Sequence, residues 1–125
     1  MEAGHNPKKN VLENKSLLFA LRIINAYKYI TQDKQEYILS KQLLRSGTSV
    51  GAMIKEAEFA ESKMDFIHKL NVALKEANET RYWLMLLKGA EYISVSAYES
   101  IEEDCNELIR LLVSIIKTSR QNLPK

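Results

Sequence analysis

The stretch Ser40–Ala52, which reads SKQLLRSGTSVGA, decides the fold. Gly47 and Gly51 are four residues apart, so on a helix they share one face. A glycine inside a helix costs about 1 kcal/mol relative to alanine. Either the helix breaks here, or the two glycines let a neighbouring helix pack closely. Because the apolar periodicity resumes at once, we expect one continuous helix over 35–58 with close helix packing at Gly47 and Gly51.

Apolar stripes with helical spacing lie on both sides of this stretch. They predict further helices over about 15–31, 63–88 and 96–120. Residues 1–14 are expected to form a flexible N-terminal arm, and 121–125 a C-terminal tail. Four helices with short connections predict an all-α fold, an antiparallel up-and-down four-helix bundle over residues 15–120.

Apolar residues cover more of these helices than a monomeric bundle needs. Residues 17–30 contain eleven apolar residues in fourteen, and 82–87 form an unbroken apolar run. The first helix therefore has two apolar faces, one of which contains Leu17, Leu21, Ile24 and Tyr27 and the other Phe19, Ile23, Ala26 and Ile30. A bundle helix needs only one apolar stripe, and large exposed patches mark association sites. We expect a homo-oligomer; the alternative is that Tyr27, Tyr29 and Tyr82 are simply exposed aromatics.

Composition narrows the class of protein. The chain has 125 residues, 46% of them hydrophobic and 27% charged, which is ordinary for a globular domain. Its single cysteine makes no internal disulfide, and its net charge of +2 does not by itself indicate a nucleic-acid or membrane partner. The N-terminal residues do not resemble a signal peptide, and no apolar stretch reaches about 18 residues. We therefore expect a cytoplasmic protein with no membrane contact.

Residue types that support catalysis or metal binding are scarce. His5 and His68 are the two histidines, and Asp65-x-x-His68 occurs once, whereas di-iron bundles need two such carboxylate–histidine pairs. We predict no metal and no cofactor, with His68 on the helix surface. Cys105 lies on the apolar side of its helix and is expected in the core rather than as a nucleophile. No catalytic residue is assigned, and no enzymatic activity is expected.

Polar residues of the second and third predicted helices could meet across one seam. The group consists of Arg45, Ser46, Ser49, Glu56, Glu76, Glu79 and Arg81. One interpretation is a hydrogen-bonded and ion-paired seam that fixes the register of the two helices. Glu76 and Glu79, three residues apart, could instead form a carboxylate pair for acid–base chemistry. A solvated surface or a contact with a partner is the third interpretation.

Basic residues near the start of the chain and in the third predicted helix are candidate phosphate contacts. They are Lys8, Lys9, Lys15, Arg22, Lys69 and Lys75. Repeated around a ring, even a modest positive face would sum into a field that attracts nucleic acid. The alternative is an ordinary solvated face, in which Lys69 pairs with Asp65 four residues before it.

The stretch from Ser40 to Ala52 and on through Lys55-Glu-Ala resembles the core of a bacterial four-helix-bundle family encoded in intervening sequences of large-subunit ribosomal RNA genes. The block SKMDFIHKL from Ser62 and the block ALKEANETRYWL from Ala73 are similar to the second signature of that family. The resemblance implies a homopentameric ring. It also implies a relation to the accessory variability proteins of diversity-generating retroelements, which are basic pentamers that bind nucleic acid and a reverse transcriptase. Met53 and Asn78 depart from the family pattern, which often has asparagine and a basic residue at these positions.

Two functions follow as hypotheses. The first is a non-enzymatic homo-oligomer, a pentameric ring as the resemblance implies, that acts as a nucleic-acid-associated accessory factor on RNA or DNA. The second is a scaffold that binds another protein through its apolar surface, with the aromatic residues Tyr82, Trp83 and Tyr92 as anchors.

Overall fold

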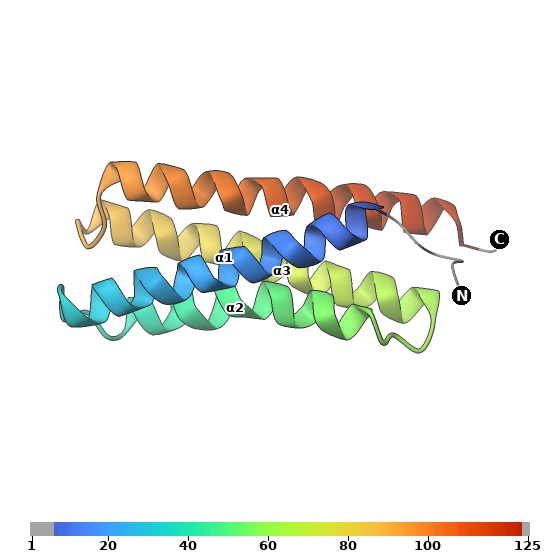
Figure 1. The fold of residues 1–125 in the computed structure, drawn as a ribbon, viewed down its shortest axis with the longest axis horizontal. Helices are drawn as coiled ribbons and strands as arrows, with labels where there is room; N and C mark the ends of the chain where they lie inside the picture. Colours follow the sequence, from blue (N-terminus) through green and yellow to red (C-terminus); the bar gives the residue numbers. More distant parts are fainter. Residues whose placement is uncertain (1–6, 124–125) are drawn as a thin grey trace.

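A computed structural model describes residues 7–123, which form four helices in an antiparallel up-and-down bundle (Figure 1). They are α1 (Pro7–Gln32), α2 (Leu39–Ala57), α3 (Lys63–Gly89) and α4 (Val95–Gln121). Each of α1 and α3 packs against both α2 and α4. Within the described residues the backbones of α1 and α3 are not adjacent, nor are those of α2 and α4, so these two pairs lie on the diagonals of the bundle. The all-α bundle predicted from the sequence is confirmed.

The first helix begins earlier than the sequence predicted. Pro7 opens α1, which suits a residue that lacks an amide hydrogen and has its backbone preset for a helix. Leu12 is buried one turn before Ser16 and continues the buried stripe of the helix toward the N-terminus. The prediction of a flexible arm over 1–14 is therefore wrong for 7–14, and residues 1–6 lie outside the described part. At the other end Gln121 closes α4, so the predicted tail begins later, and 124–125 are not described.

The second helix begins later than predicted, at Leu39, because Gln35 and Glu36 interrupt helical structure before it. Gln35 has a φ of 54°, a left-handed conformation that interrupts a helix. The Glu36 carboxylate then accepts hydrogen bonds from the amides of Ile38, Leu39 and Ser40, at 3.0, 2.9 and 2.7 Å. Burial acts to raise the pKa of Glu36, but these amide hydrogen bonds lower it below its ordinary value.

The helix containing the two glycines is continuous, as predicted. A Cβ on Gly47 would lie 2.8 Å from the side chain of Ile23, so α1 and α2 approach closely there because Gly47 has no side chain. A Cβ on Gly51 would lie 3.5 Å from Ser16, which is an ordinary contact. Of the two glycines, Gly47 is the one that the packing of α1 requires.

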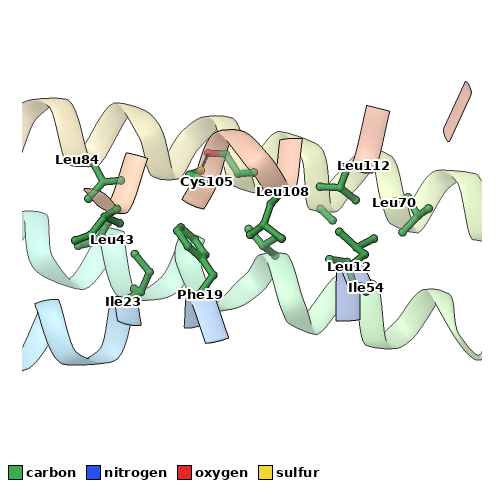
Figure 2. Close-up of a cluster of buried hydrophobic side chains, with 14 of the residues drawn as sticks. Leu12, Phe19, Ile23, Leu43, Ile54, Leu70, Leu84, Cys105, Leu108 and Leu112 are labelled. Carbon is green, nitrogen blue, oxygen red and sulfur yellow. Dashed lines mark hydrogen bonds between the residues drawn. The ribbon is translucent and has the colours of Figure 1, made fainter. Parts of the chain in front are cut away.

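The core contains one of the two apolar faces of α1. Phe19, Ile23 and Ile30 are buried, whereas Leu17 and Leu21 are 59% and 50% exposed. Figure 2 shows α1, α2, α3 and α4 all contributing to the cluster, with these side chains labelled: Leu12, Phe19, Ile23, Leu43, Ile54, Leu70, Leu84, Cys105, Leu108 and Leu112. The face of α1 that is left outside is as apolar as the face inside. No helix within residues 7–123 is long and apolar enough to cross a membrane.

Candidate functional site

The seam between α2 and α3 brings together three of the polar residues singled out in the sequence. Arg45 Nη1 lies 3.3 Å from Glu76 Oε1, and Arg45 Nη2 pairs with Glu79. The indole Nε1 of Trp83 donates to Glu79 Oε2 at 2.8 Å. Both carboxylates are thus partnered by a cation, and Glu79 also by an indole. This arrangement ties α2 to α3 across the seam.

A buried pair of hydroxyls lies behind these charges. The Oγ atoms of Ser46 and Thr80 are hydrogen-bonded at 2.9 Å, and both residues are fully buried. The Thr80 hydroxyl also lies 2.7 Å from the carbonyl oxygen of Glu76, to which it donates. The sequence reasoning missed Thr80. Its position between Ala77 and Leu84, both on the buried stripe of α3, is the signal that would have found it.

The other three seam residues do not join this cluster. The Ser49 hydroxyl donates to the carbonyl oxygen of Arg45 in its own helix at 2.6 Å. Glu56 pairs with Lys69 of α3 at 3.1 Å, further along the two helices. Arg81 faces α4 instead, where its charge acts to lower the pKa of Cys105, and its Nε is buried with no hydrogen-bond partner among residues 7–123. One residue step turns a helix by about 100°, which carries Arg81 away from the side that Thr80 occupies.

Two of the candidate phosphate contacts are ion pairs between α1 and α4. Lys15 Nζ lies 3.0 Å from Glu107 Oε1, and Arg22 Nη1 lies 2.7 Å from Asp104 Oδ2. Arg22 also donates to Ser100, to its carbonyl oxygen at 3.2 Å and to its hydroxyl at 2.5 Å. All four charged side chains of these pairs are about 40% exposed. Lys15 and Arg22 therefore offset two of the acidic charges of α4, those of Glu107 and Asp104.

The remaining candidates differ in what surrounds them. Lys8 Nζ donates to the Ser114 hydroxyl at 2.8 Å, and Lys9 Nζ lies 4.8 Å from the ring centroid of Phe66. Lys69 pairs with Glu56, not with Asp65 as the sequence suggested. Lys75 is exposed, and its ammonium makes no ion pair with any residue in 7–123. The structure does not gather the six candidates into one basic surface.

A basic face that the sequence reasoning missed lies on the second half of α4. Its exposed positions include Arg110, Val113, Lys117 and Arg120, and no acidic residue follows Glu107 in the chain. A groove of about 360 Å³ between α3 and α4 borders this face and is lined in part by Leu74, Val113, Lys117 and Arg120. We name Arg110, Lys117 and Arg120 the α4 basic face. The sequence signal is the change of sign within one helix, from acidic residues up to Glu107 to basic residues after it.

Cys105 lies in the core and His68 on the surface of α3, as the sequence predicted. Cys105 is buried, its Sγ lies 3.3 Å from the carbonyl oxygen of Ala77, and burial raises its pKa to about 12. Such a thiol is neutral at physiological pH and a poor nucleophile. His68 is exposed on α3. Within residues 7–123 no three side chains of the metal-binding types gather around one point.

A carboxyl pair that no sequence pattern indicated joins α1 to the end of α2. Burial, and then the charge of Glu58, raise the pKa of Glu13. A hydrogen bond from Lys55, whose Nζ lies 3.1 Å from Glu58 Oε2, lowers the pKa of Glu58. Glu13 therefore keeps its proton to a higher pH than an ordinary glutamate, while Glu58 stays ionised.

Taken together, the helices, seam and surface define a non-membrane-spanning all-α four-helix bundle in the described residues, with a hydrogen-bonded α2–α3 seam. Residues 8–114 match the model of the 23S rRNA-intervening sequence protein family, and the chain belongs to that family. No curated protein matches the chain.

A solved structure supports the same assignment. It is the crystal structure at 1.70 Å resolution of a protein with unknown function from the S23 ribosomal protein family of Bacteroides thetaiotaomicron VPI-5482. The two chains are 59% identical, and the match covers 88% of this chain and 98% of that one with a TM-score of 0.87. The resemblance drawn from the Ser40 and Ser62 blocks is thereby confirmed at the level of the family.

Proposed function

We propose that the chain is a non-enzymatic homo-oligomer, a ring of about five copies by its family resemblance, that acts as a nucleic-acid-associated accessory factor. The observation that supports nucleic-acid binding is the α4 basic face, in which Arg110, Lys117 and Arg120 are exposed with no acidic residue after Glu107. Lys75, which is exposed on α3, adds a further cation to the candidate surface.

Assembly is what makes this small face sufficient. The net charge of one chain is only +2, so a monomer has little long-range attraction for phosphate. A ring presents one copy of the α4 basic face per protomer, and the number of phosphates neutralised grows with the number of copies. For duplex DNA the logarithm of the binding constant falls with the logarithm of salt concentration by about 0.9 per phosphate neutralised.

The test is a binding titration with the full chain. Fluorescent single-stranded RNA and duplex DNA are titrated at several salt concentrations, first with the wild type and then with the double variant Lys117→Glu and Arg120→Glu. The control is Lys34→Glu with Lys41→Glu, which changes the net charge equally at exposed positions outside the α4 basic face. We expect salt-dependent binding that the first pair abolishes and the control keeps. Absence of binding at low salt, or equal loss in both double variants, contradicts the proposal.

A protein scaffold is the second candidate. Among its proposed aromatic anchors, Tyr82 is 53% exposed, while Trp83 is partly buried and hydrogen-bonded to Glu79. Tyr92 is also partly buried against the core. This function is favoured over the first if the purified protein has the absorbance ratio of protein alone at 260 and 280 nm and binds neither RNA nor DNA. It also requires a protein partner whose binding depends on Tyr82.

Charge reversal of Lys15 and Arg22 is not a clean test between the two functions. Both cations form ion pairs with α4, to Glu107 and Asp104, so their reversal also weakens the bundle. The variants at Lys117 and Arg120 avoid this, because neither side chain makes an ion pair within residues 7–123.

A further inference from the structure

Two helices of the bundle have a stretch of outward face whose most exposed positions carry no charge. On α1, the most exposed positions from Asn10 to Asn25 are Asn10, Val11, Asn14, Leu17, Leu18, Leu21 and Asn25, while Lys15 and Arg22, about 40% exposed, form ion pairs with α4. On α3, the exposed positions after Lys75 are Asn78, Tyr82, Met85 and Gly89. Surface helices of soluble proteins normally present charged side chains outward. We call these two surfaces the α1 face and the α3 face.

The other two helices, α2 and α4, present charged side chains outward. The exposed residues of α2 include Lys41, Arg45, Lys55 and Glu56. Those of α4 include Glu99, Glu103 and the α4 basic face. Charge is therefore absent from a long stretch of two of the four helices rather than scarce over the whole molecule, and these two stretches need a physical explanation.

The two uncharged faces point to opposite sides of the bundle. Helices α1 and α3 are diagonal partners whose backbones are not adjacent within the described residues. In Figure 1, α1 crosses in front of α3, with α4 above and α2 below. A symmetric dimer would use a single self-complementary patch. Two unlike patches on different sides are what a head-to-tail assembly requires, because each copy then offers one patch to each of its two neighbours, and the assembly closes into a ring when the rotation between neighbours closes.

The shapes of the two faces are complementary. A groove of about 470 Å³ runs between α1 and α2 beside Leu17, and its lining includes the small residues Ala20, Gly51 and Ala52 as well as the charged residues Glu13 and Lys55. On the α3 face, Tyr82 and Met85 are 53% and 50% exposed and lie three residues apart on one ridge. Helices pack by placing such ridges into grooves. The two stretches, 10–25 and 75–89, are also of similar length, about 24 and about 22 Å at 1.5 Å per residue.

We propose that the α3 face of one copy, with Tyr82 and Met85 as its ridge, packs into the α1–α2 groove and against Leu17, Leu18 and Leu21 of the next copy. This pairing rests on the homo-oligomer of the proposed function and names its interface. Because α1 and α3 are both occupied, α2 and α4 face the two free surfaces of the assembly. Every copy then turns its α4 basic face toward the same surface, where the positive fields add.

The first test places one charge on each face. Leu17→Glu and Met85→Glu are made as separate proteins, and Val113→Glu, an equally exposed apolar position on α4, is the control. Light scattering after size exclusion gives the mass, and circular dichroism confirms the helices. We expect an oligomeric wild type and control, and monomers for Leu17→Glu and Met85→Glu. Mixed in equal amounts, the two variants still share one intact pair of faces, so the mixture gives a species of two chains and nothing larger.

The outcomes separate the interface from the assembly. A monomeric wild type overturns the assembly and the interface together. An oligomeric wild type with either single variant at wild-type mass, or with a mixture that stays monomeric, overturns the pairing of α1 with α3 and leaves the homo-oligomer standing.

Cross-linking provides a second measurement that does not depend on how the charged variants fold. Cys105 is the single native cysteine and is buried, so it does not compete with an introduced thiol. Leu17→Cys and Tyr82→Cys are treated with a short bis-maleimide, separately and mixed. We expect cross-linked pairs only in the mixture and a ladder of larger species in the double variant. Cross-links within either single variant indicate like-to-like contact and overturn the proposal.

Discussion

The α2–α3 seam and the α1–α4 contact are held together in different ways. Across the seam, Ser46 and Thr80 are hydrogen-bonded with both side chains fully buried, and Arg45 forms an ion pair with Glu76 between the same two helices. Between α1 and α4, the polar contacts are exposed ion pairs and hydrogen bonds, and the shorter of the two ion pairs joins Arg22 to Asp104. Buried hydrogen bonds are costly to break, whereas exposed ion pairs contribute little and are screened by salt. The bundle is therefore most firmly joined at α2–α3 and most easily loosened at α1–α4.

The largest effect is expected for Thr80→Val. It leaves the Ser46 hydroxyl buried without its cross-helix partner, which costs about 1–3 kcal/mol of unfolding free energy. Urea denaturation measures the change. The double variant Ser46→Ala with Thr80→Val is expected to recover part of the loss, because no unpaired hydroxyl then remains. Additive losses in the double variant would show that the hydroxyl pair is not coupled across the seam.

A change of about 1 kcal/mol is expected for Glu36→Ala, which removes the carboxylate that accepts amide hydrogen bonds at the start of α2. Burial opposes ionisation of Glu36, whereas the hydrogen bonds from the backbone amides favour it. The net effect lowers the pKa of Glu36. The stabilisation is therefore present above the pKa of the unfolded chain and is lost as pH falls through the lower, folded value.

Thermal or urea unfolding from neutral to acid pH measures the difference in unfolding free energy between wild type and Glu36→Ala. This difference should become smaller as the pH falls. Glu103→Ala, an exposed carboxylate on α4, is the control and should cost less. A difference that stays constant through acid pH contradicts the capping role of Glu36.

A smaller loss is expected for Arg22→Met, which breaks the pair with Asp104 at the α1–α4 contact. Exposed ion pairs are worth roughly 0.2–1 kcal/mol, and this one is about 40% exposed on both sides. Urea denaturation at low and high salt distinguishes this ion pair from the buried hydrogen bond of the seam, because salt screening should reduce the stability lost in Arg22→Met. A loss as large as that of Thr80→Val, unaffected by salt, would reverse the comparison between the two contacts.

The smallest effect is expected for Glu13→Gln, at the junction of α1 and α2. Burial and the charge of Glu58 raise the pKa of Glu13, so the folded state holds its proton more tightly than the unfolded state does. Stability then falls as pH rises through the folded pKa, and a glutamine avoids that loss. We expect a slightly higher melting temperature for the variant at neutral pH and no difference in acid. A lower melting temperature at neutral pH would contradict the repulsive role of Glu58.

The sequence predicted the fold well because helical periodicity and the glycines constrain it strongly. It could not say which apolar face of α1 lies inside, since Leu17 and Ile23 belong to equally apolar stripes. The choice depends on the close approach of Ile23 to Gly47, a contact 24 positions away in the chain.

The candidate site was less predictable because it depends on the rotation of each helix. Arg45 and Glu79 form an ion pair, as expected, but Arg81 is turned toward α4. Lys15 and Arg22 form ion pairs with acidic residues of α4. The start of α1 was missed because Lys8 and Lys9 read as a polar arm, although Leu12 continues the buried stripe.

The most direct test of the account is the mass of the full wild-type chain, measured by size exclusion with light scattering while absorbance is recorded at 260 and 280 nm. The account predicts a mass of several copies, with excess absorbance at 260 nm from nucleic acid that co-purifies at low salt and is removed at high salt. A single 14.4 kDa chain with a protein-only spectrum would contradict it, because the uncharged faces of α1 and α3 would then have no partner copy and the α4 basic face no phosphate.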